Sequence, residues 1–136
     1  MSEADPSPPI TCVCRAIVYS HALSARYYGL PVYLVGGALT DPDPRDLDIV
    51  IPVPNDLFLA MYGDPEDTTN GWVDGRRTSQ PPPMWLRWAK DCAKQGRELT
   101  LFCRRAVDFK TQPKSYFDTF EDKPKRRLDC NILNTP

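Results

Sequence analysis

A short apolar strand that ends in two glycines, followed by a strand that carries two aspartates, constrains this chain most strongly. Val32–Val35 is apolar and rich in β-forming residues, and it stops at Gly36 and Gly37. After a polar connection the chain becomes apolar again, and Asp46 and Asp48 stand two residues apart in that run. Because side chains alternate along a strand, both carboxylates point to one face and their apolar neighbours to the other.

This arrangement predicts a site for a metal ion and a phosphate. Two like charges side by side on a strand are unfavourable, and a divalent cation removes the penalty. Hard carboxylate oxygens suit Mg²⁺ or Mn²⁺. Gly36 and Gly37 have no Cβ, so their backbone can approach a phosphate closely and turn N–H groups toward it. Each half alone also fits an ordinary turn or a solvent-facing edge strand, but both in this order predict a nucleoside triphosphate (NTP) held beside its metals.

The same residues resemble the DNA polymerase beta-like nucleotidyltransferase superfamily, which includes CCA-adding enzymes, poly(A) polymerases and minimal nucleotidyltransferases. Its signature is a hydrophobic residue, Gly-Gly or Gly-Ser, a spacer, and Asp-x-Asp among hydrophobic residues. Val35-Gly36-Gly37 and Asp46-Leu47-Asp48-Ile49 fit that signature. The superfamily also has a third carboxylate on a later strand, often after basic residues, and Arg126-Arg127-Leu128-Asp129 supplies a match. The resemblance spans the chain from about Pro31 to Leu133.

The resemblance implies nucleotidyl transfer by two metal ions. Asp46 and Asp48 would hold two Mg²⁺ (or Mn²⁺) ions, Asp129 would complete the acceptor-side site, and Gly36 and Gly37 would cradle the β- and γ-phosphates. A hydroxyl oxygen would attack the α-phosphorus of the NTP, and pyrophosphate would leave. Three converging carboxylates would raise the pKa of at least one of them in the metal-free protein. The acceptor stays open between an RNA end, a protein hydroxyl and a small molecule.

One phosphate contact departs from the resemblance. CCA-adding relatives carry Arg-Asp soon after Gly-Gly, whereas this chain has Thr40-Asp41. We therefore take Thr40, Arg45, Arg76 and Arg77 as candidate nucleotide-binding residues beside the two glycines. Trp72 near the paired arginines fits stacking on a base, and a loop anchored by one buried tryptophan explains it equally well.

The charge distribution fits metals on one side and a polyanion on the other. Residues 1–68 hold three basic and ten acidic side chains, whereas residues 69–136 hold fourteen basic and eight acidic ones. Two other classes of function remain open. One is an inactive module of the same fold, such as a regulatory, antitoxin-like or virion-associated protein, and the other is a plain nucleic-acid-binding module. The three acids favour an enzyme, because neither alternative needs them.

The sequence predicts an α/β fold of the α+β type, a mixed sheet with helices packed on it. We expect residues 1–9 to be a flexible lead-in and 10–136 to form one domain. Residues 63–83 form either a functional loop or a short hairpin, and the structure of residues 104–120 is left open. The expected helices are 11–29, 55–62 and 83–94, the last closed by Gly96; the expected strands are 32–35, 46–51, 97–103 and 126–133.

Composition points to the cytoplasm and away from membranes. No apolar run approaches the roughly 20 residues that span a bilayer, and the acidic, proline-rich N-terminus is unlike a signal peptide. His21 is the only histidine, which argues against a hydrolase triad. The cysteines are odd in number and lack a second metal-ligand pair, so we expect reduced thiols; they are Cys12, Cys14, Cys92, Cys103 and Cys130.

Overall fold

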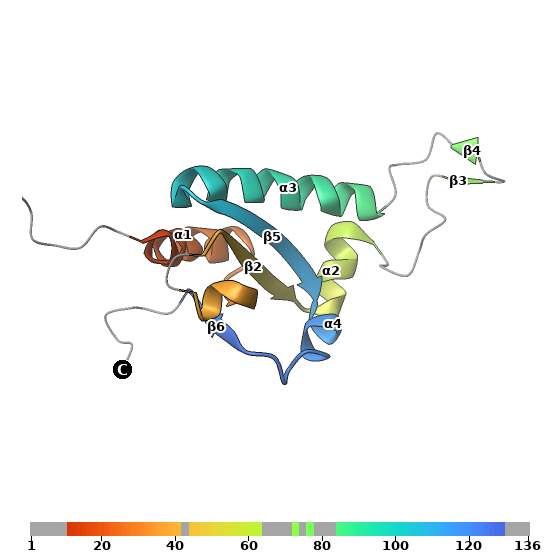
Figure 1. The fold of residues 1–136 in the computed structure, drawn as a ribbon. Coiled ribbons are helices and arrows are strands. Elements are labelled where there is room, and N and C mark those ends of the chain that lie inside the picture. Colours follow the sequence, from red (N-terminus) through yellow and green to blue (C-terminus); the bar gives the residue numbers. More distant parts are fainter. Residues whose placement is uncertain (1–10, 42–43, 64–71, 74–75, 78–83, 130–136) are drawn as a thin grey trace, which may run out of the picture.

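A computed structural model describes residues 11–41, 44–63, 72–73, 76–77 and 84–129 of the chain. These residues form helices packed on a four-stranded mixed sheet (Figure 1), which confirms the predicted fold class. The predicted lead-in 1–9 and the end of the last predicted strand, 130–133, lie outside the described residues. The elements are α1 (Cys12–Arg26), β1 (Tyr33–Val35), the 3₁₀ helix η1 (Gly36–Leu39), β2 (Asp46–Val53), α2 (Asn55–Tyr62), β3 (Trp72–Val73), β4 (Arg76–Arg77), α3 (Met84–Cys103), β5 (Ala106–Pro113), α4 (Lys114–Asp118) and β6 (Lys125–Arg127).

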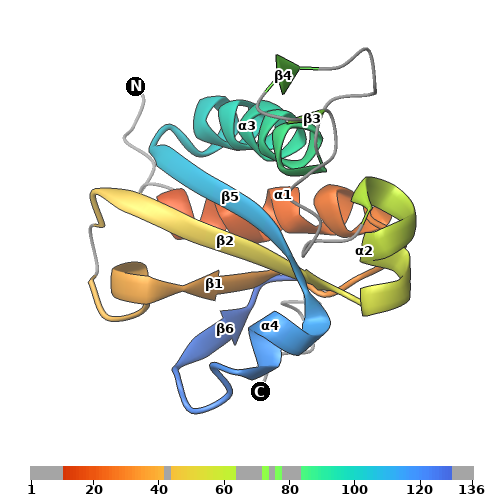
Figure 2. The ribbon, with the colours of Figure 1, turned by 90° about the vertical axis from the view of Figure 1, so that its right-hand side faces the viewer.

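The sheet has one face covered by long helices and one face that is largely open. Its strand order is β5-β2-β1-β6, with β2 parallel to β5 and β1 antiparallel to both β2 and β6. Figure 2 shows the strands with α1 behind them and α4 in front of their lower part. On β2, Leu47, Ile49 and Ile51 are each at most 1% exposed and form the centre of the core with α1 and α3. The open face therefore carries the alternate residues of the strands.

Helix α1 begins where its sequence predicts and ends at Arg26, three residues before Gly29. Thr11 caps it, since its Oγ1 accepts a hydrogen bond from the Cys14 N–H at 3.1 Å. The chain leaves the helix through Gly29, which has a φ of +75° and donates its N–H to the Ser24 carbonyl. The buried face of the helix includes Ala16 and Leu23, both 0% exposed. This face of α1 thus packs in the core.

Helix α3 corrects two sequence predictions at once. Gly96 does not close a helix, and the predicted strand 97–103 is wrong, because α3 runs unbroken from Met84 to Cys103. A Cβ on Gly96 would lie 3.3 Å from the Val107 carbonyl oxygen, so this glycine lets the helix approach β5 closely. Leu99 and Cys103, four residues apart, are buried, whereas Leu101 is 80% exposed. That spacing is helical.

The region left open by the sequence, 104–120, contains β5 and α4. Along β5 the buried Phe109 and Thr111 alternate with the exposed Asp108 and Lys110, so the strand has an ordinary period of two. Strand β2 also runs farther than expected, to Val53, because its proline at position 52 lies beyond the pairing with β1.

In the segment 63–83, the described residues form a two-stranded ladder in which Trp72 pairs with Arg77. This agrees with the hairpin alternative for that segment. Within the described chain, no helix combines the length and apolar character needed to cross a membrane.

Candidate metal and nucleotide site

The two aspartates of the sequence motif begin strand β2 on the open face of the sheet. Asp46 is exposed and Asp48 is half-buried, whereas Leu47 between them is 0% exposed on the core face. Antiparallel pairing sets Asp48 directly opposite Val35, the last residue of β1. The carboxylate therefore lies where β1 turns into the glycine pair, as the sequence motif predicts.

Gly36 and Asp48 touch in a way that only glycine permits. Gly36 has a φ of +78°, a region that residues with a Cβ rarely occupy. A Cβ built on Gly36 would lie 2.7 Å from Asp48 Oδ2, well inside contact distance. The neighbouring Gly37 is different, since a Cβ there would meet no atom within 4 Å. The turn thus brings bare backbone against one carboxylate and leaves open space on its other side.

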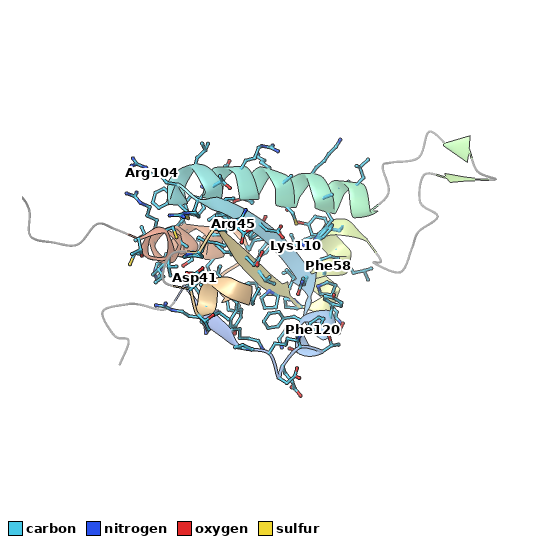
Figure 3. The ribbon with its side chains drawn as sticks, viewed as in Figure 1. Asp41, Arg45, Phe58, Arg104, Lys110 and Phe120 are labelled. Atoms are coloured by element: carbon cyan, nitrogen blue, oxygen red, sulfur yellow. The ribbon has the colours of Figure 1, made fainter. Side chains whose placement is uncertain are left out.

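A third carboxylate, Asp108, joins the two aspartates from strand β5. In the parallel register Asp108 is the partner of Asp48, so both side chains project from the open face. Lys110 Nζ lies 3.5 Å from Asp108 Oδ2, and Figure 3 shows the Lys110 side chain over the strands. Sequence reasoning missed Asp108. The alternation of Val107, Asp108, Phe109 and Lys110 was the signal that marks an acid on a strand.

The acidic face raises the pKa of Asp48 above its usual value. Burial is the largest cause, and the negative charges of Asp108 and Asp46 add to it, while Lys110 partly offsets the shift. The sequence predicted a raised pKa for at least one acid of the site, and Asp48 has it. The later acid that contributes to this rise is Asp108. A cation placed against these oxygens would remove the repulsion that the carboxylates exert on one another.

Asp129, the predicted third carboxylate, belongs to a different part of the sheet. Its Oδ1 accepts hydrogen bonds from the Val32 N–H at 3.0 Å and from Arg127 Nε at 2.9 Å. Val32 lies three residues before Val35, the partner of Asp48, which is about 10 Å along a strand. The predicted convergence of Asp129 with Asp46 and Asp48 is therefore wrong. Strand β6 carries Asp129 past the end of β1 that is farther from Asp48.

The hydrogen bonds of Asp129 hold its pKa below the usual value. Burial is the largest single influence and raises the pKa, but the hydrogen bonds from Arg127 and from backbone N–H groups, together with the positive charge of Arg127, outweigh it. The net pKa is lowered, and the side chain is only 8% exposed. The Asp129 carboxylate therefore links the end of β6 to the start of β1 through its hydrogen bonds.

We expect Asp129→Asn to destabilise the fold by about 1–3 kcal/mol at pH 7, the cost of weakening a hydrogen-bonded charge. Because the folded pKa of Asp129 is lowered, its stabilising effect is present above the unfolded pKa of about 3.9 and is lost as pH falls through the folded value. Urea unfolding at pH 7 and pH 3 should show a difference from wild type that shrinks at pH 3. Asp118→Asn, which breaks the exposed pair with Lys114, is the control and should cost at most about 0.5 kcal/mol. Equal stability of Asp129→Asn and wild type at pH 7 would contradict a stabilising role for the hydrogen bonds of Asp129.

The remaining candidate nucleotide-binding residues do not gather as closely. Thr40 is exposed at the end of η1 and donates its N–H to the Gly37 carbonyl at 3.3 Å. Arg45 is exposed immediately before β2 and is labelled in Figure 3. Arg76 and Arg77 form β4, which Figure 1 draws away from the main sheet, and their side chains lie outside what the structure describes. Of these four, only Thr40 and Arg45 adjoin the acidic strand and the glycine turn along the chain.

The donor set fits Mg²⁺ or Mn²⁺ better than a softer ion. The three carboxylates are hard oxygen donors, without cysteine or histidine among them. Across the described ranges, no group of three or more such side chains is drawn close enough to hold an ion alone. Mg²⁺ is ordinarily held by one or two carboxylates together with water and substrate phosphates, so an open acidic face beside an anion-binding turn suits it.

Comparisons of this chain with family models, with curated proteins and with solved structures find no match.

Proposed function

We propose that this protein is a Mg²⁺- or Mn²⁺-dependent nucleotidyltransferase that moves a nucleoside monophosphate from an NTP to a hydroxyl acceptor. The observation that carries the proposal is the contact of Gly36 with Asp48, in register with Asp108 on the neighbouring strand. It supports the proposal because nucleotidyl transfer needs carboxylates and a phosphate-binding turn at one place. The resemblance of 35–37 and 46–49 to the polymerase beta-like superfamily adds to this support.

Each group in the site has a defined task in this proposal. Asp46 and Asp48 supply oxygen ligands, and Asp108 takes the third position that the resemblance gives to a carboxylate on a later strand. Bound Mg²⁺ would supply charge neutralisation for the attacking and leaving oxygens. The backbone at Gly36 and Gly37 holds the triphosphate, since bare amides can approach its oxygens closely. Lys110, beside Asp108, limits the negative charge that the incoming NTP meets.

A second candidate is a module that binds nucleotide without turnover. One observation favours it: Lys110 Nζ lies 3.5 Å from Asp108 Oδ2 and forms an ion pair with it. An ion-paired carboxylate is less available to a metal than a free one. The two candidates share the nucleotide site and differ only in whether Asp108 is released from Lys110 when the substrate binds.

The proposal places the protein in the cytoplasm, where NTPs and Mg²⁺ are available. Unpaired thiols support this location, since Cys12, Cys14, Cys92 and Cys103 are free in the structure. Cys130 lies outside the described residues. The acceptor is a hydroxyl of an RNA end, a protein or a small molecule.

Titration calorimetry and a labelling assay test the proposal together. We expect each binding NTP to bind more tightly with Mg²⁺ or Mn²⁺ than without them, and an NTP labelled at its α-phosphate to label an acceptor in a cell lysate with release of pyrophosphate. Asp108→Asn should reduce transfer at least about tenfold, the effect of losing one oriented charge in a reaction site, whereas Asp118→Asn should not. NTP binding that is equal with and without divalent ions contradicts the site. Metal-dependent binding without pyrophosphate release favours the second candidate.

A further inference from the structure

A cavity of about 410 Å³ opens on the same face of the sheet as the acidic site. Val35 and Val50 form its sheet side, and Phe117 and Phe120 face them from α4 and the turn after it. Its volume falls within the roughly 300–1,000 Å³ of sites that bind small molecules. Gly36 also lines the cavity, and Gly36 is the residue that touches Asp48. The cavity and the acidic site therefore share Gly36.

The apolar wall of the cavity includes one aromatic ring that is left accessible. Phe117 is 8% exposed and packs against the Tyr33 ring, with centroids 5.2 Å apart, so it belongs to the floor. Phe120 is 39% exposed, although it meets Tyr116 edge-on at 5.2 Å. Figure 3 shows Phe120 at the α4 end of the molecule. An accessible ring beside an apolar floor is a surface on which a flat heterocycle can stack.

The polar groups of the cavity suit a ligand that carries both an edge with hydrogen-bonding groups and a negative charge. Gln112 lines it from β5, and its amide can both donate and accept. Lys123 and Lys125 add two cations. Lys125 Nζ lies 5.1 Å from the centroid of the Phe117 ring and donates to the Phe120 carbonyl at 3.4 Å, which holds this charge at the cavity.

We propose that this cavity binds the base and ribose of a nucleotide, with the base on Phe120, Gln112 at its edge, and the phosphates directed by Lys125 toward Gly36. Apolar walls, an amide and two cations match the face of a base, its edge and the phosphates, and a purely apolar ligand would leave the amide and the cations unused. The direction of the phosphates rests on the proposed function. The binding of the base does not, because it requires neither the metal nor the carboxylates.

The test measures binding of the four ribonucleoside 5′-monophosphates in the presence of EDTA, by NMR titration of the full chain. At least one should bind, and Phe120→Ala should weaken it at least about fivefold, as expected for loss of a base–aromatic stack. Phe102→Ala is the matched control. Phe102 is 40% exposed and lies 5.2 Å from a tyrosine ring, Tyr19, but it belongs to α3 on the helical side of the sheet. Its removal should leave affinity unchanged.

A second variant tests the inference independently if Phe120→Ala fails to fold. Gln112→Ala should change the order of affinities among the four nucleotides, because its amide meets the edge of the base and not its face. Equal affinities of wild type, Phe120→Ala and Gln112→Ala overturn the inference, as does the absence of any metal-independent binding.

Failure of this inference is distinguishable from failure of the proposed function. Binding that depends on Phe120, without any transfer, keeps the cavity assignment and overturns the enzyme. Metal-dependent transfer with the same KM in Phe120→Ala and Phe102→Ala keeps the enzyme and overturns the cavity assignment.

Discussion

Asp48→Asn should abolish nucleotidyl transfer and, in the same protein, raise the thermal stability of the metal-free fold. Loss of a metal-binding carboxylate removes several kcal/mol of transition-state stabilisation, so the rate should fall on the order of a thousandfold. The gain in stability follows from the raised pKa of Asp48, which burial and the charges of Asp108 and Asp46 produce. An amide of the same shape keeps the packing and removes the unfavourable charge.

The pH dependence gives the sign of this effect. Because the folded pKa of Asp48 is raised, the folded state favours its protonated form, and that stabilisation is lost as pH rises through the folded value. Asp48→Asn should therefore melt at a higher temperature than wild type at pH 7 in EDTA, with the difference closing below about pH 4. Added Mg²⁺ and NTP should stabilise wild type more than the variant.

Asp118→Asn again serves as the control for the loss of one negative charge, because Asp118 is exposed on α4. It should retain transfer and respond to Mg²⁺ and NTP as wild type does. Transfer by Asp48→Asn within tenfold of wild type would remove Asp48 from the reaction. A lower melting temperature for this variant in EDTA would show that its charge stabilises the fold.

Gly36→Ala should be the most damaging of three matched glycine substitutions. Alanine at a φ of +78° is strained by about 1–2 kcal/mol, and its Cβ would also lie 2.7 Å from Asp48 Oδ2. Gly29→Ala carries the strain alone, since Gly29 has a φ of +75° and open space around it. Gly37→Ala carries neither and should leave the free energy of unfolding nearly unchanged. Gly36→Ala should also weaken metal-dependent NTP binding, because it displaces the Asp48 carboxylate, whereas Gly29→Ala should leave that binding unchanged.

Urea unfolding of the three variants and calorimetry with Mg²⁺ and NTP give the comparison. The double variant Gly36→Ala/Asp48→Ala isolates the contact, since it removes the clash and keeps the backbone strain. Its destabilisation should be smaller than the sum of the two single effects. If Gly36→Ala lowers the free energy of unfolding no more than Gly29→Ala does, the clash with the Asp48 carboxylate does not contribute to the destabilisation.

Local sequence was sufficient for the elements whose signals lie within a few residues. Thr11 caps the start of α1 and Gly29, with its positive φ, lies three residues beyond its end, and both signals depend only on neighbouring backbone groups. The motif from Gly36 to Asp48 was predicted for a similar reason. Its two strands are joined by a short connection and pair directly, so their alternation alone placed both aspartates on one face beside the turn.

Sequence could not distinguish a glycine that ends a helix from one that allows close packing. Gly96 follows a helical pattern, and a C-terminal cap is the local interpretation of such a glycine. The decisive contact is with Val107 of β5, whose carbonyl oxygen lies 3.3 Å from the position of the missing Cβ. That contact depends on how α3 packs on the sheet, and the helix consequently continues to Cys103.

The sequence alone determined that two aspartates face the same way beside a glycine turn, and the tertiary structure decided which acid joins them. Asp108 and Asp129 both follow an apolar residue in a short alternating segment, so neither is preferred locally. Parallel pairing of β2 with β5 sets Asp108 opposite Asp48, whereas β6 pairs with β1 and carries Asp129 to the Val32 N–H. Strand order is set by burial of residues far apart in the chain, and no local pattern encodes it.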